Sequence, residues 1–285
     1  MQELHPIHLH IERKLSEEIG LQVKILHIYE VSGGCINRGQ KLETTAGNFF
    51  TKTNSEARFP GMFEAERKGL ELLKSTGTIN LPDCLMSGVW NQQSFLLLEF
   101  IEAGKRKQDY WEKCGRQLAN LHKHSQDKFG LDHNNYIGSL QQTNTYSKSW
   151  TEFFLEERLM KIGQDLISPY YDLLRKRIEE IVPHEKPALL HGDLWNGNLL
   201  TGPEGEAYFI DPSVYYGHRE MDLAMTELFG GFPSEFYASY NEAFPQNPGF
   251  KIRRDLYNLY PLLVHVKLFG VGYAQQVKSI LHSLE

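Results

Sequence analysis

The chain has 285 residues, 41% of them apolar, and a formal net charge of −6 at pH 7. That length suits one large domain or two lobes around a substantial core. Without a basic excess the sequence argues against a nucleic-acid partner, and no apolar run is long enough to cross a membrane.

The start of the chain and its cysteines indicate where the protein works. The first twenty residues contain no apolar stretch suited to a secretory signal. The three cysteines, Cys35, Cys84 and Cys114, are an odd number, and their spacing suits neither a zinc site nor a disulfide framework. We therefore expect a cytoplasmic protein.

The first hundred residues predict a small lobe that contains a sheet and one helix. Runs of β-branched and aromatic residues indicate strands, and apolar residues at three- and four-residue steps indicate a helix. The expected strands are 23–29, 40–44, 48–53 and 94–101, and the expected helix is 60–75.

A glycine-rich turn lies between the first two of these strands, in the sequence VSGGCINRG. Gly33 and Gly34 permit a phosphate group to approach the backbone closely. The turn matches neither the protein-kinase nor the P-loop pattern, and a plain hairpin turn would look the same. Its position ahead of Lys52 favours a nucleotide-binding loop.

Lys52 and Glu66 are expected to pair. Glu66 shares a helix face with Phe63 and Leu70, and a carboxylate that faces an apolar interior is costly unless it is paired. Lys52, on the strand just before, is the natural partner. In kinases such a lysine reaches the nucleotide phosphates, although an ordinary structural ion pair would give the same pattern.

Glu99, Phe100 and Ile101 end the last strand of this lobe. In a kinase the corresponding backbone contacts adenine. The carbonyl of Glu99 would accept from the adenine amine, and the amide of Ile101 would donate to the ring. Glu99 would otherwise be only a residue at the lobe junction.

The second part of the chain is predicted to be mainly helical. Trp111, Cys114, Leu118 and Leu121 mark one face of a helix, and one or two more helices are expected within 150–181. We therefore expect a nucleotide-binding lobe at 1–101 and a catalytic lobe at 102–285.

The most informative motif is LLHGDLWNGNLL, followed by FID after a short hairpin. Asp193 and Asn198 have the separation found in a kinase catalytic loop. Asn198 enters the hairpin and Asp211 leaves it, so both side chains are expected at the same end, where one Mg²⁺ could bridge them. The competing interpretation is that these are turn residues in an ordinary loop.

Several segments together resemble the fructosamine kinase (ketosamine-3-kinase) family, which belongs to the aminoglycoside phosphotransferase-like branch of the kinase fold. The segments are SGGCIN, FFTKTN, MFEAERKGLELL, LLLEFI, LHGDLWNGN, FIDPSVYYGHREMDLAMTELFGGF and LYNLYPLLVHVKLFGVGY. The resemblance covers residues 5–280, and the last two segments are the most family-specific. It implies an α+β, two-lobed protein-kinase-like fold: a small N-lobe with an antiparallel sheet and one helix, and a larger, mainly helical C-lobe.

The resemblance implies ATP-dependent phosphorylation, with Mg²⁺, of the third sugar carbon of a ketosamine. Fructosamine, ribulosamine and erythrulosamine adducts are such substrates, small or protein-bound, and phosphorylation releases the amine as a deglycation repair. Asp193 would be the base, Asn198 and Asp211 the magnesium ligands, and Lys52 with Glu66 the phosphate-positioning pair. Trp195 would be a sugar-stacking wall beside the base, and core packing is the alternative.

Polar residues beyond Asp211 are given structural roles. His218, Arg219, Glu220 and Asp222 are expected to brace the catalytic loop, with Asp222 as the N-cap of a helix. His265 is expected to be a satisfied core histidine. Asn196 stands where the family resemblance predicts serine.

Cys35 is a candidate redox switch, because the backbone amides of a phosphate loop would also stabilise a thiolate. In several members of the family that the chain resembles, a cysteine here links two subunits, so a monomer or a redox-linked homodimer is expected. The plainer interpretation is a small residue tolerated in a turn.

Two other functions remain open at this point. One is a related small-molecule kinase of the aminoglycoside or choline kinase type, against which the family-specific segments argue. The other is a non-catalytic nucleotide-binding scaffold, against which the full set of catalytic residue types argues.

Overall fold

The computed structural model describes residues 4–31 and 37–285. The chain forms two compact units, one made of Met1–Glu71 with Pro82–Glu102 and the other of Leu72–Leu81 with Ala103–Glu285. None of the helices described is both long and apolar enough to span a membrane.

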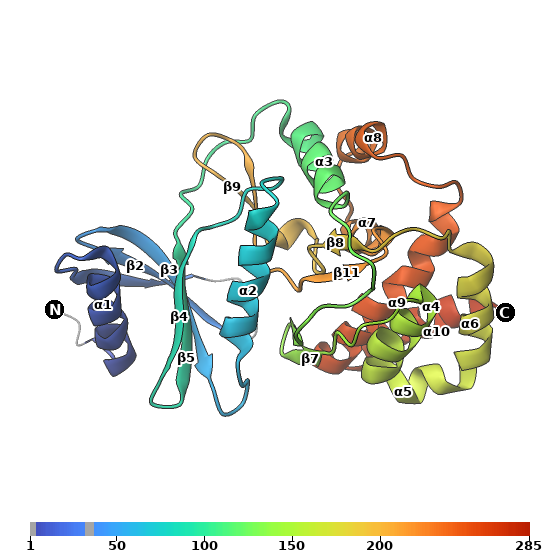
Figure 1. Ribbon diagram of the computed structural model, residues 1–285, viewed down its shortest axis with the longest axis horizontal. Coiled ribbons are helices and arrows are strands. Elements are labelled where there is room, and N and C mark those ends of the chain that lie inside the picture. Colours follow the sequence, from blue (N-terminus) through green and yellow to red (C-terminus); the bar gives the residue numbers. More distant parts are fainter. Residues whose placement is uncertain (1–3, 32–36) are drawn as a thin grey trace. The chain divides into compact units, whose positions relative to one another are not determined.

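The first unit contains a five-stranded antiparallel sheet with the strand order β1-β2-β3-β5-β4 (Figure 1). Its strands are β1 (Ile25–Glu30), β2 (Arg38–Thr44), β3 (Gly47–Ser55), β4 (Cys84–Trp90) and β5 (Gln93–Glu99). The edge strand β4 is not anticipated by the sequence, because its half-buried residues show no apolar alternation. It pairs with β5 through a tight turn at Asn91 and Gln92, both with positive φ.

Two helices belong to this part of the chain, so the expectation of one helix is wrong. The additional helix, α1 (Pro6–Ile19), lies on the sheet (Figure 1). Its residues Ile7, Ile11 and Leu15 pack against apolar side chains of the strands. Helix α2 (Met62–Ser75) buries Phe63, Leu70 and Leu73, as its apolar spacing predicts.

The second unit is mainly helical. Its longer helices are α3 (Tyr110–Leu121), α5 (Lys161–Ile167), α6 (Tyr171–Ile181), α7 (Glu220–Leu228), α8 (Ser234–Ala243), α9 (Phe250–Phe269) and α10 (Ala274–Ser283). A short α4 (Trp150–Glu152) leads directly into a π-helical segment at Phe153–Met160, and 3₁₀ turns lie at Ser168–Tyr170, Asn196–Asn198 and Val271–Tyr273.

The core of the second unit forms around α9. This helix packs against α5, α7, α10 and the π-helical segment (Figure 1). Leu256, Leu259 and Leu263 are buried along it. Gly163 permits the close approach of α5, because a Cβ atom there would lie 2.5 Å from a methyl carbon of Leu263.

Three small antiparallel ladders complete the second unit and position its loops. They are β6 (Asn135–Ile137) with β7 (Leu140–Gln142), β8 (Ala188–Leu190) with β11 (Tyr215–Gly217), and β9 (Leu199–Thr201) with β10 (Ala207–Phe209). The β9–β10 ladder is the hairpin expected after the catalytic motif. The other two ladders interrupt a region for which the sequence predicts helices.

Candidate active site

The loop that carries Asp193 begins directly after the buried strand β8. Gly192 has a φ of +83°, and a Cβ atom there would lie 2.0 Å from the carbonyl oxygen of Ser213. Only glycine fits this turn, because a side chain would be strained and would collide with the backbone. The turn brings Asp193 to the surface of the second unit, where its side chain is half-buried.

Asp222, on α7, holds the start of this loop. Its carboxylate accepts hydrogen bonds from the backbone N–H groups of His191 and Gly192, each at 2.8 Å, and from Nε2 of His122 at 3.1 Å. Burial alone would raise the pKa of Asp222, but these hydrogen bonds and the neighbouring histidines lower it. The prediction that Asp222 braces the loop agrees with these contacts. The N-cap prediction is wrong, because Arg219 occupies the N-cap and the carboxylate of Asp222 faces the loop.

His191 is fixed in one neutral form. Its Nε2 donates to the carbonyl of Ile210 at 3.0 Å, and its Nδ1 accepts from the backbone N–H of Asp193 at 3.3 Å. Burial lowers the pKa of His191, which keeps the imidazole uncharged. The ring therefore connects the Asp193 loop to the residue that precedes Asp211.

Asn198 and Asp193 are in direct contact. The Nδ2 of Asn198 donates to the backbone oxygen of Asp193 at 2.8 Å and to its carboxylate oxygen Oδ2 at 3.1 Å. Because the amide nitrogen is used in this way, the amide oxygen of Asn198 is the atom turned away from Asp193. Burial and the negative charge of Asp211 raise the pKa of Asp193 to about 7.

The hairpin brings Asp211 to the same place. Leu199 pairs with Phe209, and the backbone N–H of Ile210 donates to the carbonyl of Asn198 at 3.1 Å. Asp211 follows with a φ of +56°, a left-handed conformation that aspartate tolerates better than most residues. The structure thus brings Asp193, Asn198 and Asp211 together at one end of the hairpin. One amide oxygen and carboxylates are oxygen donors of the kind that Mg²⁺ prefers.

In the first unit, Lys52 and Glu66 form the expected pair. The Nζ of Lys52 lies 2.6 Å from Oε1 of Glu66, and only 6% and 12% of the two side chains is exposed. Lys52 is on β3 and Glu66 on α2, so the pair joins sheet and helix. Its role towards a nucleotide stays a prediction.

For the other residues predicted to bind the nucleotide, side-chain contacts say less about the role. Glu99 ends β5. Its backbone N–H donates to the carbonyl of Asp83 at 2.8 Å, and its carboxylate accepts from the backbone N–H of Asp83 at 3.2 Å. Because the side chain is used in this way, any contact of Glu99 with adenine would be made by its backbone. Lys41 lies over the ring of Phe100 at 4.2 Å, and Ile101 follows. Gly33, Gly34 and Cys35 lie outside the described residues.

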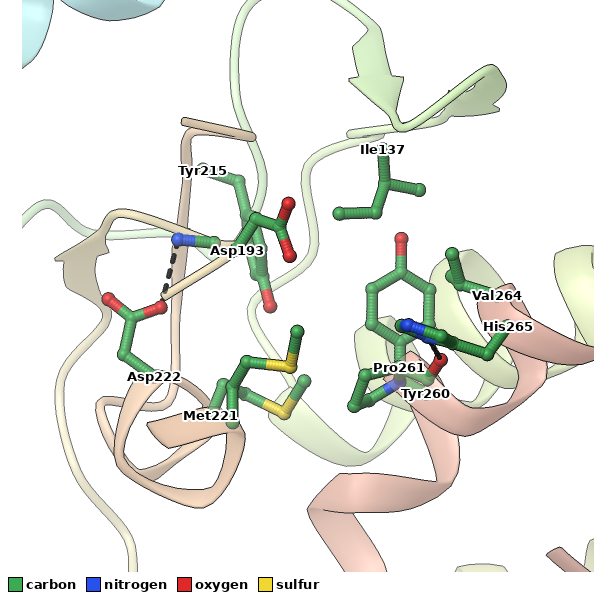
Figure 2. A pocket seen from close by; sticks show the side chains of 11 residues that line it. Ile137, Asp193, Tyr215, Met221, Asp222, Tyr260, Pro261, Val264 and His265 are labelled. Carbon is green, nitrogen blue, oxygen red and sulfur yellow. Dashed lines mark hydrogen bonds between the residues drawn. The ribbon is translucent and has the colours of Figure 1, made fainter. Parts of the chain in front are cut away.

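A pocket that is partly open to solvent lies beside Asp193 in the second unit. Figure 2 shows the carboxylate of Asp193 and the hydroxyl of Tyr260 facing the same space. The pocket is lined by Ile137, Gly192, Asp193, Tyr215, Met221, Asp222, Met225, Tyr260, Pro261, Val264 and His265.

Three outcomes at this pocket differ from the sequence analysis or add to it. Tyr260 was missed, since within the apolar pattern of α9 it looks like a core residue. His265 was expected in the core, but it is half-buried and lines the pocket, one helical turn after the buried Pro261. Trp195 does not line the pocket; it is 37% exposed and its ring meets Phe229 edge-on at 6.0 Å.

The chain is similar to known proteins over almost its whole length. The family model for fructosamine kinase matches residues 7–285. The chain is 39% identical over 279 residues to a probable ketoamine kinase of Synechocystis sp., a match that covers 95% of this chain and 94% of the relative. It is 40% identical over 278 residues to the chloroplastic protein-ribulosamine 3-kinase of Oryza sativa subsp. indica, covering 92% of this chain and 80% of the relative.

Solved structures show the same relationship. A putative fructosamine-3-kinase from Haemophilus somnus has a TM-score of 0.87 and 30% identity, with 96% of each chain covered. An aminoglycoside phosphotransferase in complex with AMP-PNP and hygromycin B has a TM-score of 0.62 at 14% identity, with 96% of this chain and 98% of that chain covered, and shares the fold alone. The α+β, protein-kinase-like fold expected from the sequence is confirmed. On the family match and these identities, the chain belongs to the fructosamine kinase family.

Proposed function

We propose that this protein transfers the terminal phosphoryl group of ATP to the hydroxyl on the third sugar carbon of a ketosamine. Ketosamines are the adducts left when a reducing sugar glycates an amine. The observation that carries the proposal is the placement of Asp193, in contact with Asn198 and on the lining of a pocket. The names of the relatives, a probable ketoamine kinase and a protein-ribulosamine 3-kinase, support the substrate class.

Asp193 is assigned to the acceptor hydroxyl. Its carboxylate faces the pocket, where it can accept a hydrogen bond from the hydroxyl and take up its proton as phosphoryl transfer proceeds. The hydrogen bond from Asn198 and the rigid turn at Gly192 hold the carboxylate in one orientation. This positioning matters because phosphoryl transfer depends on alignment more than on covalent chemistry.

Asn198 and Asp211 are assigned to Mg²⁺. The amide oxygen of Asn198 and the carboxylate of Asp211 lie at the same end of the hairpin. No group of three or more His, Cys, Asp or Glu side chains within residues 4–31 and 37–285 could hold a metal ion by itself. Two protein ligands suffice for Mg²⁺, which takes further oxygens from phosphates and water and neutralises charge on the phosphates.

Nucleotide binding is assigned to the first unit. Lys52, held by Glu66, would contact the phosphates. The carbonyl of Glu99 and the amide of Ile101 would bind the adenine edge next to Phe100, and the backbone at Gly33 and Gly34 would approach the phosphates. The positions of Lys52 on β3 and of Glu99 at the end of β5 support these roles within a kinase-like fold.

The product explains what the activity would achieve. Phosphorylation at the third carbon destabilises the adduct, so the amine is released and the glycation is repaired. We propose that ribulosamine and erythrulosamine adducts, free or protein-bound, are at least as good substrates as fructosamines. A sugar-stacking role for the part-exposed Trp195 would be played outside the pocket, because Trp195 does not line it. A cytoplasmic location would suit such a repair enzyme.

The proposal is tested by ATP turnover with defined acceptors. Ketosamines derived from fructose-, ribose- and erythrose-type sugars are compared with an aminoglycoside and with choline. Magnesium-dependent ADP release with ketosamines, together with recovery of the free amine, is expected. Turnover of an aminoglycoside or of choline with no ketosamine turnover would favour the related small-molecule kinases instead.

A further inference from the structure

A chain of buried polar side chains leads to the pocket from the π-helical segment. Arg158, on that segment, is fully buried. Its guanidinium donates to the backbone oxygen of Thr143 at 2.6 Å and to the side-chain oxygen of Asn144 at 2.8 Å, and it lies 4.0 Å from the ring centre of Tyr215. The positive charge of Arg158 therefore heads a hydrogen-bond network behind the pocket wall.

The groups at the two ends of this network determine the direction of every hydrogen bond within it. Arginine only donates, so Asn144 presents its oxygen to Arg158 and its amide nitrogen to Asn135, at 3.0 Å. The amide nitrogen of Gln142 donates to Asn135 (2.8 Å) and to the backbone carbonyl of Ser213 (3.1 Å), which only accepts. The side-chain oxygen of Gln142 must therefore accept from another group.

That group is the hydroxyl of Tyr260, at 2.7 Å from Gln142. The proton of Tyr260 is committed to the network, and burial raises the pKa of this phenol, so it stays protonated. What the hydroxyl offers to a ligand is a lone pair. Tyr260 consequently acts as a hydrogen-bond acceptor on the pocket side.

His265 is also an acceptor towards the pocket. Its Nδ1 lies 2.7 Å from the carbonyl oxygen of Pro261, so Nδ1 carries the proton and donates. Burial lowers the pKa of His265, which keeps the ring neutral. Its Nε2 therefore carries a lone pair (Figure 2).

The pocket as a whole offers acceptors and negative charge. Its eleven lining residues include the carboxylate of Asp193 but neither lysine nor arginine, and Met221 and Met225 are apolar members of the lining. A ligand that fits such a pocket must bring hydrogen-bond donors and positive charge, since buried polar groups need partners.

We propose that Tyr260 and His265 bind the secondary ammonium group of the ketosamine, the hydroxyl oxygen of one and the Nε2 of the other each accepting one of its two N–H groups. The inference rests on the proposed function. In a ketosamine the nitrogen is attached to the first carbon, two carbons from the hydroxyl assigned to Asp193, so one pocket can hold both. Arg158 acts as a positioning residue, because its network holds the proton of Tyr260 away from the ammonium.

The test compares two acceptors that differ only at this nitrogen. One is a 1-alkylamino-1-deoxyketose, and the other is the matching 1-O-alkyl ketose, in which an ether oxygen replaces the amine. Wild type is expected to prefer the amine in kcat/KM by at least about tenfold, the effect of one or two hydrogen bonds to a charged group. In Tyr260→Phe and in His265→Phe, the ratio of kcat/KM for the amine to kcat/KM for the ether (the amine-to-ether ratio) should be about tenfold lower than in wild type. The main cause should be a higher KM for the amine.

Tyr237→Phe is the matched control. The hydroxyl of Tyr237 bonds to Thr226 and to the backbone N–H of Phe232, and Tyr237 does not line the pocket. Its loss should leave the amine-to-ether ratio at the wild-type value. Thermal unfolding shows whether each variant is folded. If Tyr260→Phe proves unstable, His265→Phe still tests the subsite, because it leaves the hydrogen bond between Tyr260 and Gln142 untouched.

The outcomes separate this inference from the proposed function. If wild type phosphorylates both acceptors equally well, the ammonium subsite is wrong while the kinase activity stands. If Tyr260→Phe and His265→Phe lower both activities in the same proportion, the two residues do not recognise the amine. If wild type phosphorylates neither acceptor, the proposed function itself has failed.

Discussion

At the scale of single residues, Asp193 is the group whose chemistry matters most. Asp193→Asn keeps the shape and the contact with Asn198 but removes the carboxylate that meets the acceptor hydroxyl. We expect kcat to fall by roughly 10²- to 10⁴-fold with nucleotide affinity nearly unchanged. Steady-state kinetics and nucleotide titration measure the two effects. The same change at the exposed Asp132 is the control, and near-normal turnover by Asp193→Asn would remove the assignment.

Asp211 is best tested by asparagine. Its φ of +56° is tolerated by asparagine but strained for alanine, so Asp211→Asn removes charge with little disturbance of the backbone. We expect magnesium-dependent binding of an ATP analogue to weaken by more than about tenfold, as loss of a charged metal ligand requires. Calorimetric titration at several Mg²⁺ concentrations measures this, with Asp127→Asn as an exposed control. An unchanged magnesium dependence would contradict the assignment.

At the scale of elements, helix α7 and the catalytic loop depend on each other through Asp222. In Asp222→Asn an amide N–H₂ group replaces one oxygen and faces backbone donors that then lack a partner. We expect the free energy of unfolding to fall by roughly 2–4 kcal/mol and kcat to fall with it. Chemical denaturation measures the first effect. Glu227→Gln, on the same helix, breaks only a part-exposed ion pair with Arg254 and should cost less than about 1 kcal/mol. Equal stability of the two variants would contradict the bracing role.

At the scale of the whole molecule, oxidation tests whether Cys35 links two subunits. Burial raises the pKa of Cys84 to about 12 and raises that of the fully buried Cys114 as well, so neither thiol is expected to react. Under oxidant, wild type should therefore lose activity or form a reducible dimer, and Cys35→Ala should do neither. Activity and size-exclusion chromatography, with and without reductant, measure both. Cys84→Ala is the control, and an unchanged response in Cys35→Ala would place the reactive thiol elsewhere.

Features encoded over short stretches of chain could be predicted from the sequence. The Asp193–Asn198 separation, the hairpin that carries Asp211 and the helix face shared by Glu66 and Phe63 depend on neighbouring residues and on the periods of strand and helix. The bracing role could be predicted for Asp222, but Arg219 and Glu220 pair with Glu185 and Arg253 and not with the catalytic loop.

Only the tertiary structure decided the features that join distant segments. The position of α1 on the sheet, the edge strand β4 and the clamp of Asp222 on the loop depend on packing between stretches with no common period. The pocket is the clearest case. Tyr260 looks like a core residue of an apolar helix, and only the network from Arg158 determines where its hydroxyl proton is donated. Hydrogen-bond direction is a property of the assembled network, so no single segment of the sequence contains it.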